Sequence, residues 1–368
     1  MSEQTAHALV LEEPRTLRER ELPLPQTGDD DALLRVEACG LCGTDHEQYT
    51  GHLHPGYGFV PGHESVGILE RIGSAAAKRW GVREGDRVAV EVFLSCGTCA
   101  PCQAGDSQRC ARHGLADMYG FVPSDREPGL WGGYSQYQYL APDSQVLKVP
   151  DALDPITATM FNPLGAGVRW GVSLPGTRNG DVVAVLGPGV RGLSVVAAVK
   201  QAGAGFVMVT GLGSRDGARL ATAKRFGADL TVDVGVEDPV AALEDATGGR
   251  ADVVVDVTAR APAAFTQAVK LARPGGTIIL AGTRGTTDVP GFRPDDLVFK
   301  ELRVLGALGV DTPSYQAALE LLEDGAYPFA DVSRHVAGLA DVDTLLETMA
   351  GEAGEPPLHA VVDPWKDT

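Results

Sequence analysis

Short runs of apolar and β-branched residues, separated by glycine and proline, fill the first part of the chain. Residues 31–40 read DALLRVEACG, and similar runs follow at 65–72 (SVGILERI) and 86–92 (DRVAVEV). Runs of this length between turn-forming residues are typical of β-strands. The pattern therefore predicts a β-rich region over about the first 155 residues.

The pattern changes after Asp181, where apolar runs alternate with longer amphipathic stretches. We expect strands at 182–186, 206–210, 253–258 and 276–282, and helices that begin near 190, 217 and 262. Buried strands alternating with helices predict an α/β fold, a parallel sheet with helices on both faces. Further helices are expected at 313–324 and 341–350, and a last strand near 358–362.

Length and composition limit the possible classes of protein. A chain of 368 residues exceeds the roughly 250–300 residues at which single cores stop growing, which favours two domains. The net charge of −18 disfavours nucleic acid as a partner. No apolar run approaches the ~18 residues that span a membrane, and Met1–His7 lacks the pattern of a secretory signal. We expect a cytoplasmic protein without membrane contact.

Four of the six cysteines are crowded into one segment with the spacing C-x2-C-x2-C-x7-C: Cys96, Cys99, Cys102 and Cys110. In a reducing compartment such crowding points to metal and away from disulfides. Four thiolates can surround one zinc ion and leave no open position, so the predicted role is structural. An iron–sulfur cluster is the alternative, although a ferredoxin-type run has three residues before its last cysteine.

A second group of candidate metal ligands is spread over two short motifs. Cys42-Gly43-Thr44-Asp45 follows the first predicted strand, and Gly62-His63-Glu64 precedes the next. Taken singly, each motif is a weak signal. Together they offer a thiolate and an imidazole, both of which zinc accepts.

A glycine-rich fingerprint directly follows the strand 182–186. Its sequence is Gly187-Pro188-Gly189-Val190-Arg191-Gly192. Between a strand and a helix, this G-x-G-x-x-G spacing allows a tight turn and brings a pyrophosphate close to the helix N-terminus. The fingerprint predicts a dinucleotide-binding domain.

The order of these motifs, CGTD, GHE, CGTCAPC and then the fingerprint, resembles the zinc-dependent alcohol dehydrogenases of the medium-chain dehydrogenase/reductase superfamily. The resemblance covers essentially the whole chain. It implies a GroES-like β-rich catalytic domain over 1–156 and 310–368, with a structural-zinc lobe at about 94–112. A Rossmann domain would occupy 157–309.

The resemblance also implies a catalytic zinc held by Cys42 and His63, with Glu64 as a further ligand in some members. The remaining ligand comes from the segment before the Rossmann domain, where the position falls on Asn162. An amide is a weaker zinc ligand than a carboxylate. Either Asn162 holds the metal through a water, or Glu64 takes a larger share of the coordination.

Proton transfer in the family starts at the hydroxyl that corresponds to Thr44. Many relatives continue it through a histidine five residues after the cysteine, but here that position is Glu47 and His46 precedes it. The outer part of the relay is therefore not predicted. We expect Asp45 to orient His63 from behind the metal.

The cofactor is expected to be NADP(H) in preference to NAD(H). The acidic position that binds the ribose in NAD-specific folds falls on Gly211, whereas Ser214 and Arg215 could bind a 2′-phosphate. In the alternative, Asp216 serves the ribose of NAD. Further cofactor contacts are expected at three later strand ends: Thr258, Gly282 and Leu308.

The resulting hypothesis is hydride transfer between a nicotinamide dinucleotide and a small alcohol, aldehyde or ketone, by a homodimer or homotetramer with two zinc ions per chain. Aromatic residues of the loop 115–131 either line the substrate pocket or pack beneath the loop: Tyr119, Phe121 and Trp131, with Met118. A zinc-free quinone or enoyl reductase and a non-catalytic NADPH-binding protein are the alternatives.

Overall fold

The computed structural model describes residues 4–53 and 56–366. The chain forms two compact units. The first unit comprises Met1–Phe161, Leu319–Gly325 and Phe329–Thr368, and the second comprises Asn162–Ala318 and Ala326–Pro328. In the described part of the chain, no helix combines the length and the hydropathy needed to cross a bilayer.

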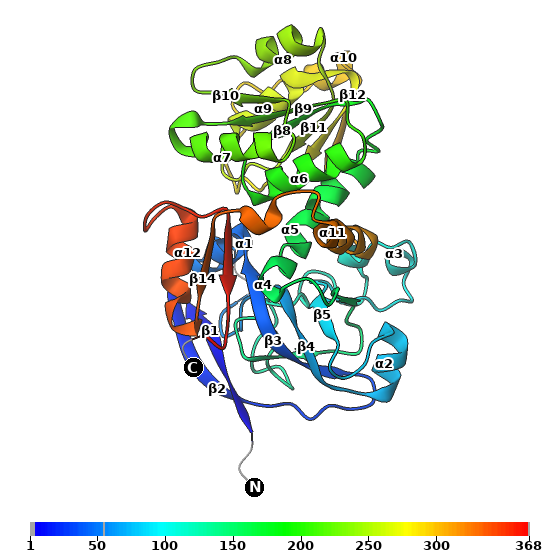
Figure 1. Cartoon of the computed structure of the whole chain (residues 1–368), viewed down its shortest axis with the longest axis vertical. Coiled ribbons are helices and arrows are strands. Elements are labelled where there is room, and N and C mark those ends of the chain that lie inside the picture. The colour runs from blue at the N-terminus through cyan, green and yellow to red at the C-terminus, as the bar shows by residue number, and fades with distance from the viewer. Residues whose placement is uncertain (1–3, 54–55, 367–368) are drawn as a thin grey trace. The chain divides into compact units, whose positions relative to one another are not determined.

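The first unit is built on a mainly antiparallel sheet with the order β14-β15-β3-β4-β5-β7, in which β6 also pairs with β3 (Figure 1). Its strands are β3 (Ala32–Leu41), β4 (Glu64–Ile72), β5 (Arg87–Val90), β6 (Tyr137–Leu140), β7 (Val146–Lys148), β14 (Arg334–Ala337) and β15 (His359–Val362). A separate antiparallel hairpin is formed by β1 (Thr5–Glu13) and β2 (Thr16–Pro23).

Helices of the first unit are short: α1 (Gly43–Tyr49), α2 (Ser74–Trp80), α3 (Ala100–Gln103), α4 (Pro155–Ala158) and α12 (Val342–Ala350). The register of the sheet positions the first candidate site. Gly40 of β3 lies opposite Glu64 of β4 in an antiparallel pair. Cys42, just after β3, and His63, just before β4, are therefore brought to the same end of the sheet.

The second unit contains a six-stranded parallel sheet with the order β10-β9-β8-β11-β12-β13. Its strands are β8 (Val182–Leu186), β9 (Phe206–Gly211), β10 (Leu230–Asp233), β11 (Ala251–Asp256), β12 (Ala272–Leu280) and β13 (Arg303–Gly306). The order reverses between β8 and β11, and dinucleotides bind at such a switch point, outside the carboxyl ends of the strands.

Helices cover both faces of this parallel sheet, with α6 (Val190–Gln201) and α7 (Gly213–Arg225) on one face and α8 (Pro239–Thr247) and α9 (Ala263–Leu271) on the other (Figure 1). The remaining helices are α5 (Phe161–Val168), which continues into a π-helical turn at Arg169–Ser173, α10 (Asp295–Phe299) and α11 (Thr312–Asp324). The α/β fold class is confirmed.

Most predicted elements lie within a few residues of the observed ones, and the differences lie at the ends of the elements. Helix α7 begins at Gly213 instead of near 217, because the carboxylate of Asp216 accepts a hydrogen bond from the backbone N–H of Leu212 (3.0 Å) and stabilises the first turn. Strand β12 begins at Ala272 instead of 276, and β11, β12 and β13 end at Asp256, Leu280 and Gly306, shortly before the expected strand ends Thr258, Gly282 and Leu308.

The division into units also differs from the predicted domain limits. Residues 157–161 lie with the first unit, because α4, which includes residues 157 and 158, packs on β3 and β4. Residues 310–318 lie with the second unit, where Asp311 accepts a hydrogen bond from Nε of Arg169 (3.1 Å).

Candidate active site and metal sites

Cys42, Asp45 and His63 form a buried cluster in the first unit. Sγ of Cys42 lies 3.4 Å from Nε2 of His63, and Nδ1 of His63 lies 3.5 Å from Oδ1 of Asp45. The other carboxylate oxygen of Asp45 accepts a hydrogen bond from the backbone N–H of Cys42 (2.8 Å). The imidazole is thus held between a carboxylate on one nitrogen and a thiol on the other.

This geometry fits zinc. A tetrahedral ion with Zn–S near 2.3 Å and Zn–N near 2.0–2.1 Å separates its sulfur and nitrogen ligands by about 3.6 Å. A metal-bound histidine commonly directs its other nitrogen at a carboxylate, which is the position of Asp45. Cys42 and His63 could therefore present ligand atoms to a metal ion, with the Asp45 carboxylate beside the other ring nitrogen.

The charged forms of His63 and Asp45 stabilise each other inside the buried cluster. Burial disfavours the charged imidazole, but the Asp45 carboxylate and the Cys42 thiolate raise the pKa of His63 well above its usual value. Burial likewise disfavours the Asp45 carboxylate, and His63 together with the Cys42 N–H nevertheless lowers its pKa. The cluster is suited to hold a cation at its centre.

The structure places Glu64 beside this cluster but not in it. Among the described residues, the ligand atoms of Cys42, Asp45 and His63 form a mutually close group that does not include Glu64. The buried Glu64 carboxylate faces β3, where a Cβ on Gly40 would lie 2.4 Å from Oε2. Only a glycine at position 40 leaves room for this side chain.

Asn162 lies at the start of the second unit and is buried. Its Nδ2 donates a hydrogen bond to the hydroxyl oxygen of Tyr315 (3.1 Å). This contact leaves Oδ1 as the atom of Asn162 that could bind a metal or a water. Nothing in the sequence pointed to Tyr315, because it lies on a distant helix.

Thr44 and His46 lie on α1, directly after Cys42. Thr44 is partly buried in the first turn of this helix. Nε2 of the buried His46 is 3.0 Å from Oε1 of Glu352, which also pairs with Arg15 (2.9 Å). His46 therefore links α1 to the segment after α12.

Sγ atoms of the four crowded cysteines all lie within 4.8 Å of one another. Sγ of Cys96 and Sγ of Cys102 are 4.0 Å apart, close to the ~3.8 Å between sulfurs in a tetrahedral zinc site. Hydrogen bonds from the hydroxyl and N–H of Thr98 and from the Cys99 N–H lower the pKa of Cys96 to about 5. The cluster fits a closed site of four thiolates.

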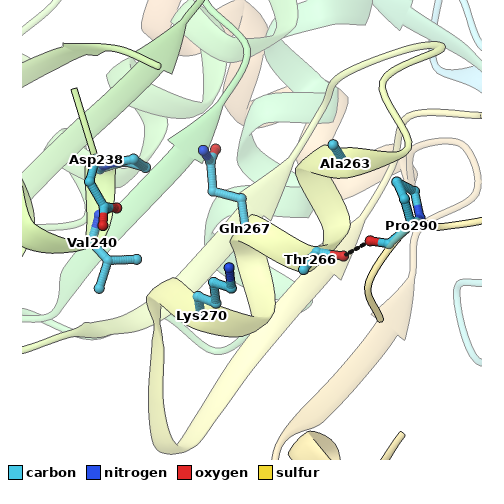
Figure 2. A pocket seen from close by; sticks show the side chains of 8 residues that line it. Asp238, Val240, Ala263, Thr266, Gln267, Lys270 and Pro290 are labelled. Atoms are coloured by element: carbon cyan, nitrogen blue, oxygen red, sulfur yellow. Dashed lines mark hydrogen bonds between the residues drawn. The ribbon is translucent and has the colours of Figure 1, made fainter. Parts of the chain in front are cut away.

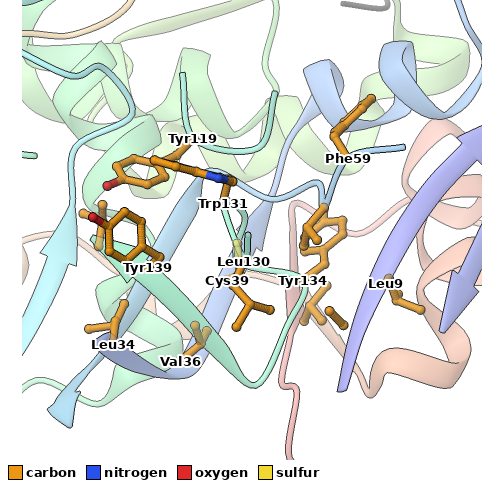
Figure 3. Packing of buried hydrophobic residues seen from close by; sticks show 14 of the residues in the cluster. Leu9, Leu34, Val36, Cys39, Phe59, Tyr119, Leu130, Trp131, Tyr134 and Tyr139 are labelled. Carbon is orange, nitrogen blue, oxygen red and sulfur yellow. The ribbon is translucent and has the colours of Figure 1, made fainter. Parts of the chain in front are cut away.

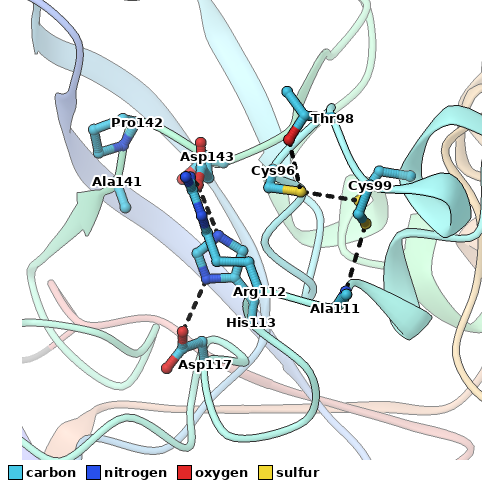
Figure 4. Close-up of polar contacts among 12 residues, drawn as sticks. Cys96, Thr98, Cys99, Ala111, Arg112, His113, Asp117, Ala141, Pro142 and Asp143 are labelled. Atoms are coloured by element: carbon cyan, nitrogen blue, oxygen red, sulfur yellow. Dashed lines mark hydrogen bonds and ion pairs between the residues drawn. The ribbon is translucent and has the colours of Figure 1, made fainter.

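A charged network follows Cys110 and fastens this lobe to its surroundings (Figure 4). His113 donates from both ring nitrogens, to Asp117 (2.8 Å) and to Asp143 (2.7 Å). Arg112 also pairs with Asp143, and Arg126 with Asp117. The network joins the end of the lobe to the loop that precedes β7.

Glycine suits each of the three fingerprint positions for a different structural reason. Gly187 has a φ of +106°, a region that favours glycine. A Cβ on Gly192 would lie 1.9 Å from the carbonyl oxygen of Gly187, so only glycine lets α6 approach the turn. A Cβ on Gly189 would meet no atom within 4 Å, which leaves that side of the helix N-terminus open to a phosphate.

The residues at and after the end of β9 are those at which the sequence predicts contacts to the adenosine ribose or its 2′-phosphate. Gly211, at the end of β9, has no carboxylate to repel a phosphate, and Ser214 and Arg215 lie exposed in the first turn of α7. Asp216 is buried and accepts from Leu212, while Asp233 accepts from the N–H groups of Gly213 and Gly235. Both nearby carboxylates are therefore engaged with backbone.

Thr258, Gly282 and Leu308, at which the sequence predicts cofactor contacts, each lie just after a strand of the parallel sheet, β11, β12 and β13. Thr258 donates to Asp256 at the end of β11, and Gly282 packs so closely that a Cβ would lie 1.9 Å from the Thr258 carbonyl oxygen. The carbonyl oxygen of Leu308 accepts from Arg169 (3.1 Å), and its side chain is half exposed.

Of the aromatic residues in the loop 115–131, Tyr119 and Trp131 belong to the hydrophobic core of the first unit (Figure 3). The Tyr119 hydroxyl bonds to Ser144 and accepts from the Ala141 N–H (3.0 Å). Phe121 lies 6.1 Å from the His63 ring, centroid to centroid. Packing explains the first two residues, and Phe121 is the aromatic next to the metal cluster.

A cavity of about 280 Å³ opens elsewhere, between α8 and α9 of the second unit (Figure 2). Its lining includes Asp238, Thr266, Gln267 and Lys270, and no candidate site residue.

The chain also matches known proteins along most of its length. Residues 28–151 match the model of the alcohol dehydrogenase GroES-like domain, and residues 191–324 match that of the zinc-binding dehydrogenases. A probable alcohol dehydrogenase of Mycobacterium tuberculosis H37Rv is 67% identical over 359 residues, covering 97% of this chain and 98% of that protein. The chain belongs to the zinc-dependent alcohol dehydrogenases of the medium-chain superfamily.

More distant relatives of this dehydrogenase differ in substrate. An erythritol/L-threitol dehydrogenase of Mycolicibacterium smegmatis is 31% identical and covers 93% of this chain and 94% of its own. The crystal structure of a putative zinc-binding dehydrogenase from Sinorhizobium meliloti 1021, bound to NADP, is 30% identical, has a TM-score of 0.81 and covers 98% of this chain and 100% of that one. The chain is thus a zinc-binding oxidoreductase that uses a nicotinamide dinucleotide and acts on small alcohol or carbonyl compounds.

Proposed function

We propose that this dehydrogenase binds two zinc ions per chain, one for structure and one for catalysis. Cys96, Cys99, Cys102 and Cys110 hold the structural ion. Cys42 and His63 hold the catalytic ion, with Oδ1 of Asn162 or the Glu64 carboxylate completing its ligands. The observation that carries this proposal is the 3.4 Å separation of the Cys42 and His63 ligand atoms, with Asp45 behind the ring.

Bound zinc would supply polarisation of the substrate oxygen and would lower the pKa of a bound hydroxyl. Residues of the chain itself orient the ligands, relay the proton and exclude water. Asp45 fixes the orientation of His63, and the Thr44 hydroxyl relays the substrate proton when an alcohol is oxidised, accepting it while it donates its own proton onward towards solvent. Phe121, beside His63, keeps water from that side of the cluster.

The activity is tested by following the absorbance of reduced nicotinamide while the purified protein is offered a panel of polyols, secondary alcohols and aromatic alcohols. We expect turnover with at least one class. A protein that binds NADPH but oxidises none of them would support the non-catalytic alternative. Turnover of quinones or enones alone would support the zinc-free reductase alternative.

We also propose a preference for NADP(H) over NAD(H), supported by Gly211, by the exposed Arg215 and by the NADP-bound relative. Replacing Arg215 with alanine removes a charged hydrogen bond worth about 1.5–3 kcal/mol, so NADPH binding should weaken at least about tenfold while NADH binding stays unchanged. Lys224→Ala, at the exposed far end of the same helix, is the matched control. Equal losses for the two cofactors would contradict the phosphate assignment.

The enzyme is further proposed to form a homodimer or homotetramer. Strand β13 is an edge of the parallel sheet, and exposed apolar side chains flank it at Val298, Phe299 and Leu308. An edge strand beside an apolar surface favours association. Light scattering should give two or four times the chain mass of 38.5 kDa, and a single-chain mass would contradict the proposal.

A further inference from the structure

A buried ion pair connects two strand ends in the parallel sheet, and none of the sequence motifs described above includes it. Asp256 ends β11 and is fully buried. Arg284 follows β12, and its guanidinium donates through NH2 to Oδ2 of Asp256 and through NH1 to the carbonyl oxygen of Gly282 (2.7 Å). One side chain therefore bridges the end of β11 and the turn after β12.

The second oxygen of Asp256 extends this connection along its own turn. Oδ1 accepts from the backbone N–H of Thr258 (3.0 Å) and from the Thr258 hydroxyl (2.6 Å). The two turns are also joined through the backbone, where Arg260 N–H donates to the carbonyl oxygen of Thr283 (3.0 Å). The turns 256–260 and 282–284 thus form one linked unit, which we call the double turn.

The double turn touches the fingerprint. A Cβ on Gly187, the first glycine of the fingerprint, would lie 3.2 Å from Cγ2 of Thr258 and 3.5 Å from Cγ2 of Val257. A side chain at position 187 would therefore be crowded by Thr258, and glycine avoids this. The backbone N–H of Val257 also donates to the carbonyl oxygen of Leu186 (3.1 Å), directly before the fingerprint, so the turn that Asp256 fixes borders the pyrophosphate-binding turn.

Location decides which part of the cofactor the double turn faces. With the proposed phosphate site at Gly211 and Arg215, the adenosine half of a bound dinucleotide would lie over β9. β11 and β12 lie on the opposite side of the switch point between β8 and β11. A dinucleotide that crosses the switch point places its nicotinamide half over β11 and β12.

Burying this pair is costly, which argues against a purely incidental contact. Burial raises the pKa of Asp256 even though Arg284 and Thr258 stabilise its carboxylate. Breaking such a pair leaves one buried charge without its partner. This ion pair lies at the carboxyl ends of β11 and β12, where a dinucleotide would bind. Its role there would be to fix the geometry of the two strand ends.

We propose that Arg284 is a positioning residue for the nicotinamide half of the cofactor, acting through Asp256 and Thr258. Arg284 fixes the conformation of the double turn, and the double turn packs against the fingerprint turn. Together the two turns determine the position of the bound dinucleotide. This inference rests on the proposed dinucleotide site and adds a residue to it.

The test is a double-mutant cycle on the dissociation constants of NADPH and NADH, measured by fluorescence well below the melting temperature. Arg284→Met and Asp256→Asn should each weaken binding of both cofactors by about tenfold, and the double variant should be no weaker than either one. Arg293→Met, an exposed arginine paired with Asp296 on the segment that follows, should leave binding unchanged.

An affinity within about twofold of the wild type for Arg284→Met, or losses that multiply in the double variant, would overturn the proposal. A merely structural role would lower the melting temperature without changing affinity in the folded protein. Should Arg284→Met fail to fold, Arg284→Lys carries the test, because lysine keeps the charge but cannot bridge Asp256 and Gly282 at once. Unchanged affinity in that variant would equally overturn it. A wild type that binds neither cofactor would instead contradict the proposed function.

Discussion

The two groups of candidate zinc ligands are built in opposite ways. The four lobe cysteines come from one continuous segment, and three of them are partly exposed. Cys42 and His63 come from the ends of two different strands, and both are buried. The comparison teaches that a structural metal site can be local and closed, whereas a reactive site needs separate segments that the fold brings together in a low-dielectric interior.

The groups that surround the two sets of candidate ligands also differ. Around the lobe, the neighbouring groups are donors, such as the Thr98 hydroxyl and the Ala111 N–H, which stabilise thiolates. At the cluster, a carboxylate stands behind the imidazole and supports a bound cation. The neighbours of the lobe stabilise the thiolates themselves, whereas the carboxylate at the cluster would act on a bound metal through the imidazole.

Removing a ligand of the buried cluster should have the largest effect on activity. For Cys42→Ala we expect kcat/KM to fall by about a thousandfold or more, because a metal ion supplies several kcal/mol of charge stabilisation and each 1.36 kcal/mol is tenfold. Cofactor binding and the melting temperature should persist. Cys39→Ala, a buried thiol outside the ligand group, is the control, and a Cys42→Ala variant as active as this control would contradict the assignment.

Removing a ligand of the lobe should instead lower stability. For Cys99→Ala we expect the melting temperature to fall by about 10 °C, since a structural metal contributes folding free energy and 1 kcal/mol shifts a large domain by roughly 2–4 °C. Thr98→Ala removes only the hydrogen bond to Cys96 and should shift it by about 2–4 °C. A Cys99→Ala variant that melts like the wild type would mean that the lobe holds no structural metal.

The smallest effect is expected at Asn162. A carboxylate binds zinc more strongly than an amide, so Asn162→Asp should tighten the more labile zinc by about tenfold in competition with a chelator. Tyr315→Phe removes the hydroxyl that accepts the hydrogen bond from Nδ2 and serves as the control. If Asn162→Asp leaves both zinc affinities unchanged, the third ligand is not at this position.

Features that lie within one continuous segment could be predicted from the sequence, whereas contacts between distant segments could not. The lobe cysteines and the fingerprint lie in continuous segments, so their spacing predicts their geometry. The strands that frame Cys42 and His63 were also predicted, because they alternate clearly with turn residues. Glu64 could not be placed from the sequence, since its direction depends on the space above Gly40 in the neighbouring strand.

Pairings between distant positions were not predictable. Tyr315 holds Asn162 across many residues of intervening chain, and Arg284 meets Asp256 only because β11 and β12 are neighbours. Helix α7 was predicted too short because Gly213 and Gly217 weaken its helix signal, whereas Asp216 stabilises its first turn. Long-range polar contacts leave no periodic pattern in a sequence.

The most direct test of the account is zinc per chain, measured by elemental analysis on the wild type, Cys42→Ala and Cys99→Ala. The account predicts two zinc ions in the wild type and one in each variant, with activity lost in the first variant and stability lost in the second. One zinc ion in the wild type, or two in Cys42→Ala, would contradict the assignment of a catalytic zinc to Cys42 and His63.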